Sequence, residues 1–465
     1  MKIVICAAEM VPFAKTGGLA DVAGALPPVL EKLGEDVIVV MPGYKQVSAS
    51  KIKVKKFKQG VSFAVIGKGV KVYFIDSEQY FYRDGIYGDK TSDYPDNLER
   101  FTYYNKRTLE LLKELDFKPE IIHCHDWHAC LIPVYLKSTH ASDPFYKDTK
   151  TILTIHNIGY QGLFPKDEFA KTGLDKSLFK SDALEYYGKV NLLKGGILFC
   201  DLINTVSPTY ALEIQTKEFG FGMEGILQRR RDSVSGILNG LDYSLWDPAE
   251  DGFISAKFDS ENIEDKYKNR DDLRKICGFP DKDVPLFGMV SRLAEQKGFD
   301  ILADAMDKIC NMDLQFVILG TGEARYHGIL EKLAVKYKDV LSVHLRFDNS
   351  LAHKIYAGSD LFAMPSKYEP CGLGQMISLR YGTIPLVFKT GGLADTVSPD
   401  NGFIFDKYTK DELINTVKRA VSAFTDKAGW QGLMHRAMEY DFSWEESGRK
   451  YLKLYEKAKE KVKGK

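Results

Sequence analysis

The sequence predicts an α/β protein built from two Rossmann-like, doubly wound domains that face a central cleft. Short apolar runs rich in Val, Ile and Leu recur along the chain, separated by segments with apolar residues at helical spacing. Strands that are apolar throughout are typical of parallel sheets covered by helices on both faces. The series occurs twice, before and after a polar stretch at 247–272, which indicates two such sheets.

The first half opens with a β-α-β unit formed by a strand at 2–9, a helix at 17–33 and a strand at 36–41. Polar and apolar residues then alternate over 51–76 around a Lys68-Gly69 turn signal, which predicts an antiparallel edge hairpin. The stretch 79–100 is rich in Tyr, Asp and Gly and predicts a surface loop. Further elements are expected as a helix at 127–136 and strands at 120–125, 151–156 and 201–206.

The second half carries six expected strands, at 285–290, 314–319, 340–345, 361–365, 384–388 and 403–405. We therefore expect an N-terminal domain at 1–245 and a C-terminal domain at 246–442. A last helix within 443–465 is expected to pack back on the N-terminal domain. In open parallel sheets, ligands bind outside the carboxyl ends of the strands.

Composition excludes several function classes. Lys plus Arg and Asp plus Glu both number 64 in 465 residues, so no field of one sign favours nucleic acid or an anionic membrane. No apolar run approaches the roughly 18 residues of a membrane helix. A strand beginning at Lys2 leaves no room for a signal peptide, and seven scattered cysteines in apolar runs indicate reduced thiols. We expect a cytoplasmic protein.

One seven-residue segment occurs twice: Lys15 to Asp21 reads Lys-Thr-Gly-Gly-Leu-Ala-Asp, and so does Lys389 to Asp395. Each copy follows an apolar run and opens an expected helix. Backbone N–H groups and the positive helix end would then face an anion in the cleft. The alternative is that two similar turns merely need glycine.

Two segments of the second half could bind a sugar phosphate. Arg292 and Lys297 follow its first strand, where two cations could hold a diphosphate, although such a pair can also be ordinary surface charge. Glu369 begins the run Glu-Pro-Cys-Gly-Leu-Gly-Gln, in which Gly372 and Gly374 permit close backbone approach. The Glu369 carboxylate could stabilise the oxocarbenium character of glycosyl transfer.

Histidines mark two strand ends of the first half. The run His123-Cys124-His125-Asp126-Trp127-His128 suggests a metal site, but a second ligand cluster of suitable spacing is missing from the sequence. We instead expect the last three of these residues to line the cleft. His156, also at a strand end, could donate to a sugar hydroxyl or simply cap a buried turn.

Taken together, these segments resemble the bacterial glycogen synthase and plant starch synthase family over nearly the whole chain. The resemblance rests on Lys15 to Val22, His125 to His128, His156-Asn157 with Tyr160 to Gly162, Asn239 to Asp242, Arg292 with Lys297, and Glu369 to Leu373. It implies a GT-B fold and a retaining glucosyltransferase. The implied donor is ADP-glucose, the implied acceptor an α-1,4-glucan such as glycogen, and neither a metal nor another cofactor is implied.

The resemblance also implies roles for single residues. Catalytic roles fall on Glu369, His156, Arg292 and Lys297. Donor and acceptor binding falls on Lys15, Gly17, Gly18, Asp21, Asp126, Asn239, Phe347, Cys371, Gly372, Leu373 and Gly374. Further acceptor contacts are expected from Tyr94, Trp127 and His128.

The chain departs from the family pattern at three positions. Gly374 stands where the family usually has Thr, Phe347 stands where it often has Tyr, and Ile377 stands where many retaining GT-B enzymes carry a second Glu. The nearest rival reading is a UDP-glucose-dependent or small-acceptor GT-B enzyme. A nicotinamide-dependent oxidoreductase would need the Gly-x-Gly-x-x-Gly fingerprint, which the sequence lacks. A non-catalytic glucan-binding protein would use tyrosines such as Tyr80, Tyr82, Tyr87 and Tyr94.

Overall fold

The computed structural model describes residues 1–89 and 91–460, which form two compact units. The first unit comprises Met1–Val206, Ala211–Gly240 and the C-terminal segment from Trp444, and the second comprises Ser207–Tyr210 and Leu241–Ser443. From the sequence we expected the N-terminal domain to end at position 245, five residues after the end at Gly240 in the structure. The last helix was expected within 443–465, and residues 461–465 of that range lie outside the described part.

The first unit is built on a nine-stranded sheet in the order β12-β11-β7-β6-β1-β2-β5-β4-β3. Seven strands are parallel, and the β3-β4-β5 segment adds the antiparallel edge that the turn signal predicted. The strands are β1 (Lys2–Cys6), β2 (Asp36–Pro42), β3 (Lys55–Lys58), β4 (Val61–Ile66), β5 (Val70–Ile75), β6 (Ile121–His125), β7 (Lys150–Ile155), β11 (Leu202–Thr205) and β12 (Val234–Gly236).

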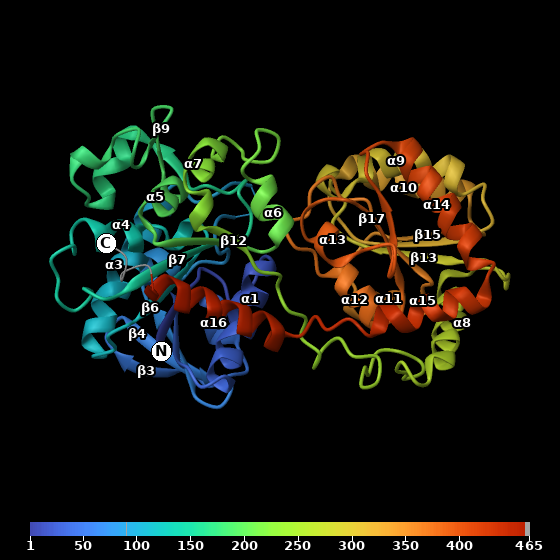
Figure 1. Cartoon of the computed structure of the whole chain (residues 1–465), viewed down its shortest axis with the longest axis horizontal. Helices are drawn as coiled ribbons and strands as arrows, with labels where there is room; N and C mark the ends of the chain where they lie inside the picture. Colours follow the sequence, from blue (N-terminus) through green and yellow to red (C-terminus); the bar gives the residue numbers. More distant parts are fainter. Residues whose placement is uncertain (90, 461–465) are drawn as a thin grey trace. The chain divides into compact units, whose positions relative to one another are not determined.

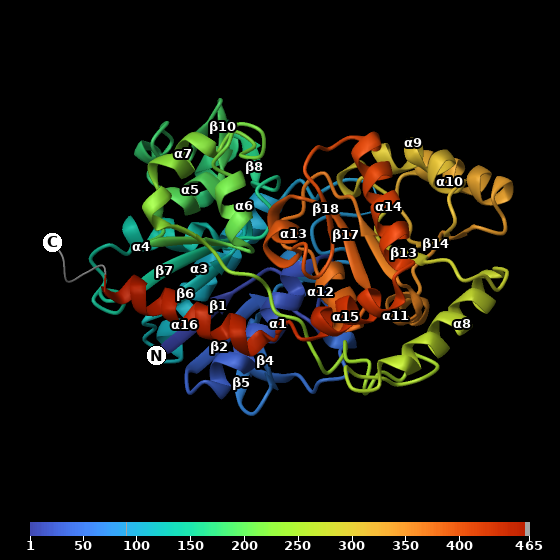
Figure 2. The same ribbon diagram turned by 45° about the vertical axis from the view of Figure 1, so that its right-hand side comes forward.

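Helices cover both faces of this sheet (Figure 1). They are α1 (Gly18–Lys32), α2 (Glu78–Phe81), α3 (Asn97–Glu114), α4 (Leu131–Lys137), α5 (Leu192–Phe199), α7 (Glu224–Arg229) and α16 (Trp444–Glu460), while α6 (Pro208–Glu213) starts within the second unit. The C-terminal α16 lies beside α1 and contacts β7, as both views show (Figure 2). The side chain of Tyr455 on α16 meets His123 of β6, with Oη 2.9 Å from Nδ1.

Three features of the first unit differ from the sequence expectation. Within the segment 79–100, the described residues form a loop only over 82–89 and 91–96, because α2 ends at Phe81 and α3 begins at Asn97. The helix expected at 127–136 starts as a 3-10 turn (Trp127–Ala129) before α4. A small antiparallel sheet of β8 (Leu163–Pro165), β10 (Lys189–Asn191) and β9 (Glu185–Tyr186) was not predicted, because strands of two or three residues leave no periodic pattern.

The second unit has a six-stranded parallel sheet in the order β15-β14-β13-β16-β17-β18. All six strands lie where the sequence predicted them, to within one or two residues. Their bounds are β13 (Leu286–Val290), β14 (Gln315–Leu319), β15 (Leu341–His344), β16 (Leu361–Met364), β17 (Ile384–Phe388) and β18 (Phe403–Phe405).

Two helical layers enclose this second sheet, with α9, α10 and α14 on one face and α8, α11, α12 and α15 on the other (Figure 1). The helices are α8 (Lys266–Cys277), α9 (Phe299–Ile309), α10 (Ala324–Lys336), α11 (Asn349–Gly358), α12 (Gly374–Arg380), α13 (Gly391–Thr396), α14 (Lys410–Phe424) and α15 (Lys427–Met438). A continuous core of buried Leu, Ile, Phe and Met fills the space between sheet and helices.

Each sheet contains a point where the chain reverses its direction of winding. In the first unit the reversal lies between β1 and β6, and in the second between β13 and β16. Ligands of open α/β sheets bind outside the carboxyl ends of the strands at such points. The loops after these four strands are therefore where each unit is expected to bind its ligand.

No helix within residues 1–89 and 91–460 is long and apolar enough to cross a membrane.

Candidate active site

The loop after β1 carries the first copy of the repeated segment. Lys15 is exposed, and its Nζ lies 2.6 Å from Oδ1 of Asp21 in the first turn of α1. A Cβ atom added to Gly17 or Gly18 would have no described residue within 4 Å. The packing of the described chain therefore does not require glycine at these positions, whereas a ligand lying against the backbone would.

Glu9 shapes this loop, and sequence reasoning missed it. Its side chain is buried and accepts hydrogen bonds from the backbone N–H of Thr16, from the Thr16 hydroxyl at 2.6 Å and from the backbone N–H of Gly17 at 3.0 Å. The expected arrangement, in which the loop amides face an anion, is thus wrong for Thr16 and Gly17. In the first turn of α1 the N–H of Ala20 donates to the carbonyl oxygen of Gly17 at 3.2 Å, so the amides of Gly18 and Leu19 are the loop's candidate backbone donors to a ligand.

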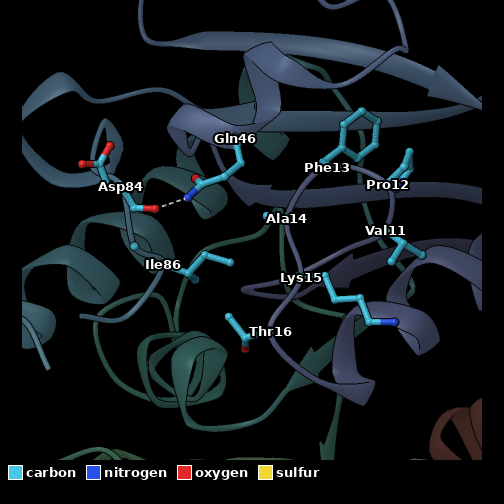
Figure 3. A pocket seen from close by; sticks show the side chains of 10 residues that line it. Val11, Pro12, Phe13, Ala14, Lys15, Thr16, Gln46, Asp84 and Ile86 are labelled. Carbon is cyan, nitrogen blue, oxygen red and sulfur yellow. Dashed lines mark hydrogen bonds between the residues drawn. The ribbon is translucent and has the colours of Figure 1, made fainter. Parts of the chain in front are cut away.

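A cavity of about 340 Å³ lies beside this loop (Figure 3). Lys15 and Thr16 line one side, and the segment Asp84 to Ile86 lines another, with Gln46 between them. The Gln46 amide donates to the carbonyl oxygen of Asp84. The remaining lining residues are Val11, Pro12, Phe13 and Ala14.

Asp126 follows β6 with φ at +53°, a left-handed backbone conformation that is uncommon for Asp. Its Oδ1 accepts the backbone N–H of His156 at 2.7 Å, so the carboxylate ties together the ends of β6 and β7. Burial raises the pKa of Asp126 to about 7, against the opposing hydrogen bond from His156, and the charge of Glu9 raises it further.

His156 Nε2 lies 2.8 Å from Nδ1 of His125, and the two rings stack with centroids 5.2 Å apart. Burial lowers the pKa of His156 to about 3, so the ring is neutral at physiological pH. His123, which shares a strand face with His125, uses both ring nitrogens, towards Tyr455 and Thr154. The described residues contain no group of three or more His, Cys, Asp or Glu side chains placed to hold a metal ion.

The three expected acceptor residues contact protein groups with their rings. Trp127 is buried and packs edge-on against Phe101. His128 stacks on Tyr87 at 4.6 Å. The guanidinium groups of Arg83 and Arg100 lie 4.8 and 4.9 Å from the Tyr94 ring centroid. These ring contacts hold the three side chains in place within the first unit, and their contacts with an acceptor stay a prediction.

Asn239 lies at the end of the first unit, where its side-chain Oδ1 is buried and has no hydrogen-bond partner among the described residues. Buried polar atoms nearly always have a partner. The Asn239 oxygen is therefore a candidate ligand contact.

In the second unit, Lys297 and Glu369 meet directly. Lys297 Nζ lies 2.6 Å from Oε2 of Glu369, and the hydroxyl of Ser366 donates to the same oxygen at 3.1 Å. The sequence predicted separate phosphate and sugar roles for the two residues but not their contact. Arg292, from the same loop, is exposed and reaches Gln296 only at 3.5 Å, which leaves its guanidinium available to a ligand.

The loop from Glu369 to Gly374 connects β16 to α12. Cys371 is buried, Leu373 is half-buried, and Gly372 has φ at +72°, which explains its glycine. A Cβ on Gly374 would lie 3.0 Å from both Met364 and Phe362, so this site is already tight without the side chain usual in the family. Phe347 follows β15 and is 88% exposed.

The second copy of the repeated segment supports this loop from behind. The N–H of Gly392 donates to the carbonyl oxygen of Glu369 at 3.0 Å. Cβ atoms on Gly391 and Gly392 would overlap the carbonyl oxygens of Glu369 and Cys371. Packing therefore requires Gly391 and Gly392 in the second copy, whereas it does not require Gly17 and Gly18 in the first.

The chain is similar to known proteins over most of its length. A family model described as "Starch synthase catalytic domain" matches residues 2–229, and one described as "Glycosyl transferases group 1" matches residues 269–425. Glycogen synthase from Geotalea uraniireducens is 49% identical over 98% of each chain. Glycogen synthase from Thermotoga petrophila is 45% identical, over 99% of this chain and all of the other.

Solved structures share the fold. The catalytic domain of starch synthase IV from Arabidopsis thaliana, bound to ADP and acarbose, superposes with a TM-score of 0.87 at 33% identity, over 98% of this chain and 99% of that one. Sucrose-phosphate synthase from Thermosynechococcus elongatus, at 17% identity and a TM-score of 0.59, shares the fold alone. With full-length relatives at more than 40% identity and a GT-B fold, the chain belongs to the glycogen synthase family of glycosyltransferases.

Proposed function

We propose that this enzyme transfers glucose from ADP-glucose to the non-reducing end of an α-1,4-glucan such as glycogen, with retention of the anomeric configuration. The observation that carries the proposal is the contact between Lys297 and Glu369 at the reversal point of the second sheet. A cation for the leaving phosphate and a carboxylate for the sugar are thereby held side by side.

The second unit holds the donor in this proposal. Arg292 and Lys297 bind the diphosphate, with the guanidinium fork of Arg292 matching phosphate oxygens. The exposed ring of Phe347 offers a face on which adenine can stack. Glu369 accepts hydrogen bonds from glucose hydroxyls, and backbone amides from Cys371 to Gly374 bind the sugar or its phosphate.

The first unit supplies contacts to the glucose and the acceptor. Lys15 neutralises phosphate charge while Asp21 holds its side chain. Gly17 and Gly18 let the backbone approach the donor, in keeping with the open space beside them. Neutral His156 donates to a glucose hydroxyl, and Asn239 orients the sugar through its unpartnered oxygen.

Asp126 acts on the acceptor side in this proposal, together with Trp127, His128 and Tyr94. A carboxyl group whose pKa is near 7 can both accept and donate a hydrogen bond at physiological pH. Asp126 therefore suits a hydrogen bond that orients the acceptor, whose proton passes to the departing phosphate.

The chemistry we propose is a front-face transfer. The bond from the glucose anomeric carbon to the β-phosphate oxygen breaks, and the acceptor 4-hydroxyl oxygen bonds to that carbon on the same face. The hydroxyl proton passes to the departing phosphate, whose negative charge Arg292 and Lys297 stabilise. Trapping a covalent glucosyl adduct on any carboxylate would replace this route by a double displacement.

We further propose a cytoplasmic enzyme that works without a metal or other cofactor. Six of the seven cysteine side chains are buried and Cys277 is half-buried, which suits thiols in a reducing compartment.

The test is an assay of nucleotide diphosphate release and glucan growth with ADP-glucose or UDP-glucose, a glycogen primer and EDTA. Growth with ADP-glucose supports the proposal. Growth only with UDP-glucose would assign a UDP-glucose-dependent enzyme, and release without growth would assign a small acceptor. Loss of activity on adding EDTA would contradict the metal-independent chemistry.

A further inference from the structure

Glu9 is a buried carboxylate at the reversal point of the first sheet. It follows β1, its side chain is 4% exposed, and the neighbouring Ala7, Ala8 and Met10 are fully buried. A carboxylate in such surroundings is costly unless hydrogen-bond donors satisfy its oxygens. The position is also next to the end of β6, where Asp126 lies.

Four donors satisfy the Glu9 carboxylate. Three come from the loop after β1, namely the N–H and hydroxyl of Thr16 and the N–H of Gly17. The fourth is the phenol of Tyr87, whose Oη lies 2.6 Å from Glu9 Oε1. One carboxylate therefore joins two loops that are about seventy residues apart in sequence.

The loop that Glu9 holds is the one that carries Lys15, Gly17 and Gly18. With the Thr16 and Gly17 amides committed to Glu9, the Lys15 side chain lies exposed beside Asp21. The space beside Gly17 and Gly18 stays open. These are the features that the proposed donor contacts need.

Tyr87 is itself fixed in place. Its carbonyl oxygen accepts the N–H of Tyr94 at 2.9 Å and the side-chain amide of Asn97 at 2.8 Å. Its ring stacks on His128, two residues after Asp126. The Tyr87 hydroxyl therefore ties Glu9 to a residue that Tyr94, Asn97 and His128 hold in place.

We infer that Glu9 is a positioning residue for glucosyl transfer, whose carboxylate fixes the Lys15–Gly18 loop against Tyr87. The inference rests on the proposed function, since the loop is positioned for that reaction. Glu9 touches no reacting atom. It acts through the loop that it holds.

The decisive variant is Glu9→Gln, which keeps the size of the side chain but replaces one acceptor oxygen by a donor facing other donors. We expect kcat to fall about 100-fold, the scale of a misplacement of about 1 Å in a catalytic group. The matched control is Glu110→Gln, which changes an exposed glutamate on α3 and should leave kcat unchanged. ADP should still bind Glu9→Gln through Arg292 and Lys297 of the second unit, but with a higher Kd, because Lys15 would no longer be held beside the phosphate, whereas Glu110→Gln should keep the wild-type Kd.

Two milder variants keep the carboxylate. Tyr87→Phe and Thr16→Val each remove one hydroxyl donor, and each should lower kcat less than Glu9→Gln while leaving thermal stability near that of the wild type. Were Glu9 merely a folding residue, these variants would keep full kcat.

Hydrogen exchange reports on the loop without any turnover. In Glu9→Gln the amides of Thr16 and Gly17 should exchange faster, while those of the β1 core should not. Unchanged exchange at these amides, or wild-type kcat in Glu9→Gln, would overturn the inference. If the wild type fails to extend glucan from ADP-glucose, the proposed function fails, whereas faster exchange would still show that Glu9 holds the loop.

Discussion

Lys297 and Glu369 form an ion pair of 2.6 Å that joins the loops after the neighbouring strands β13 and β16. Both side chains are largely buried, at 19% and 8% exposed, so the pair is screened less than a surface pair. A diphosphate bound at Lys297 would share its ammonium group with Glu369. With the donor bound in this way, the Glu369 carboxylate would lie beside the transferred glucose.

Lys297→Ala should lower kcat/KM for ADP-glucose. The transition state should lose about 2 to 4 kcal/mol of stabilisation, the scale of one preorganised electrostatic contact. Arg292→Lys should recover only part of the wild-type rate, because an ammonium group lacks the guanidinium fork. Steady-state kinetics with a glycogen primer measure both effects. The control is Lys367→Ala, which removes an exposed lysine paired with Glu295. Equal kcat/KM in Lys297→Ala and Lys367→Ala would show that Lys297 is surface charge.

The two copies of the repeated segment should respond oppositely to the same substitution. Gly18→Ala should change the free energy of unfolding by less than about 0.5 kcal/mol, since the added methyl meets no described residue, yet it should raise the KM for ADP-glucose. Gly392→Ala should destabilise the protein by about 1 to 3 kcal/mol, because its methyl overlaps the Cys371 carbonyl. Thermal unfolding of both variants measures the change in stability, and steady-state kinetics measure the KM for ADP-glucose. A stable, active Gly392→Ala would refute the packing role.

Asp126 should make stability depend on pH. Its folded-state pKa of about 7 exceeds the ordinary value of 3.8, so the folded protein binds this proton more tightly than the unfolded chain. The stabilisation is fully present below the ordinary value and is lost as the pH rises towards 7. It amounts to on the order of 4 kcal/mol. Asp126→Asn should lack this decline, as urea unfolding of both proteins at about pH 5 and pH 8 would show. If the free energy of unfolding changed equally with pH in the wild type and in Asp126→Asn, the pKa of Asp126 would not be raised.

Phe347→Ala should weaken donor binding without affecting stability. The ring is 88% exposed, so its removal costs little packing. Loss of a stacking partner for adenine should weaken donor binding by about 0.5 to 1.5 kcal/mol and so raise the KM for ADP-glucose. Phe347→Tyr keeps the aromatic ring and should keep the wild-type KM. An unchanged KM in Phe347→Ala would remove Phe347 from the donor site.

The sequence was a good guide where long-range packing imposes a local pattern. The strands of the second sheet are buried on both faces, so runs such as Phe316 to Leu319 are apolar throughout and were predicted in place. The same patterns placed Arg292, Lys297 and Glu369 at strand ends, where the structure has them. Strand β9 has only two residues, which carry no such pattern, and this strand was not predicted.

The sequence was a poor guide to contacts made across loops. Glu9 follows an apolar strand and has no motif of its own, and its four donors become apparent only when Thr16 and Tyr87 are brought together. The two copies of the repeated segment are identical in sequence, but Gly391 has φ at +43° and Gly17 an extended φ of −147°. Their different roles are set by the surrounding residues, which a local motif does not contain.

The most direct test of the central claim follows the transferred glucose itself. The enzyme is incubated with ADP-glucose labelled in the sugar, maltoheptaose and EDTA, and the products are sized and then digested with β-amylase, which removes maltose from the non-reducing ends of α-1,4-glucans. We expect longer oligosaccharides whose label is released as maltose. Label recovered as free glucose, or in a product that β-amylase does not shorten, would contradict it.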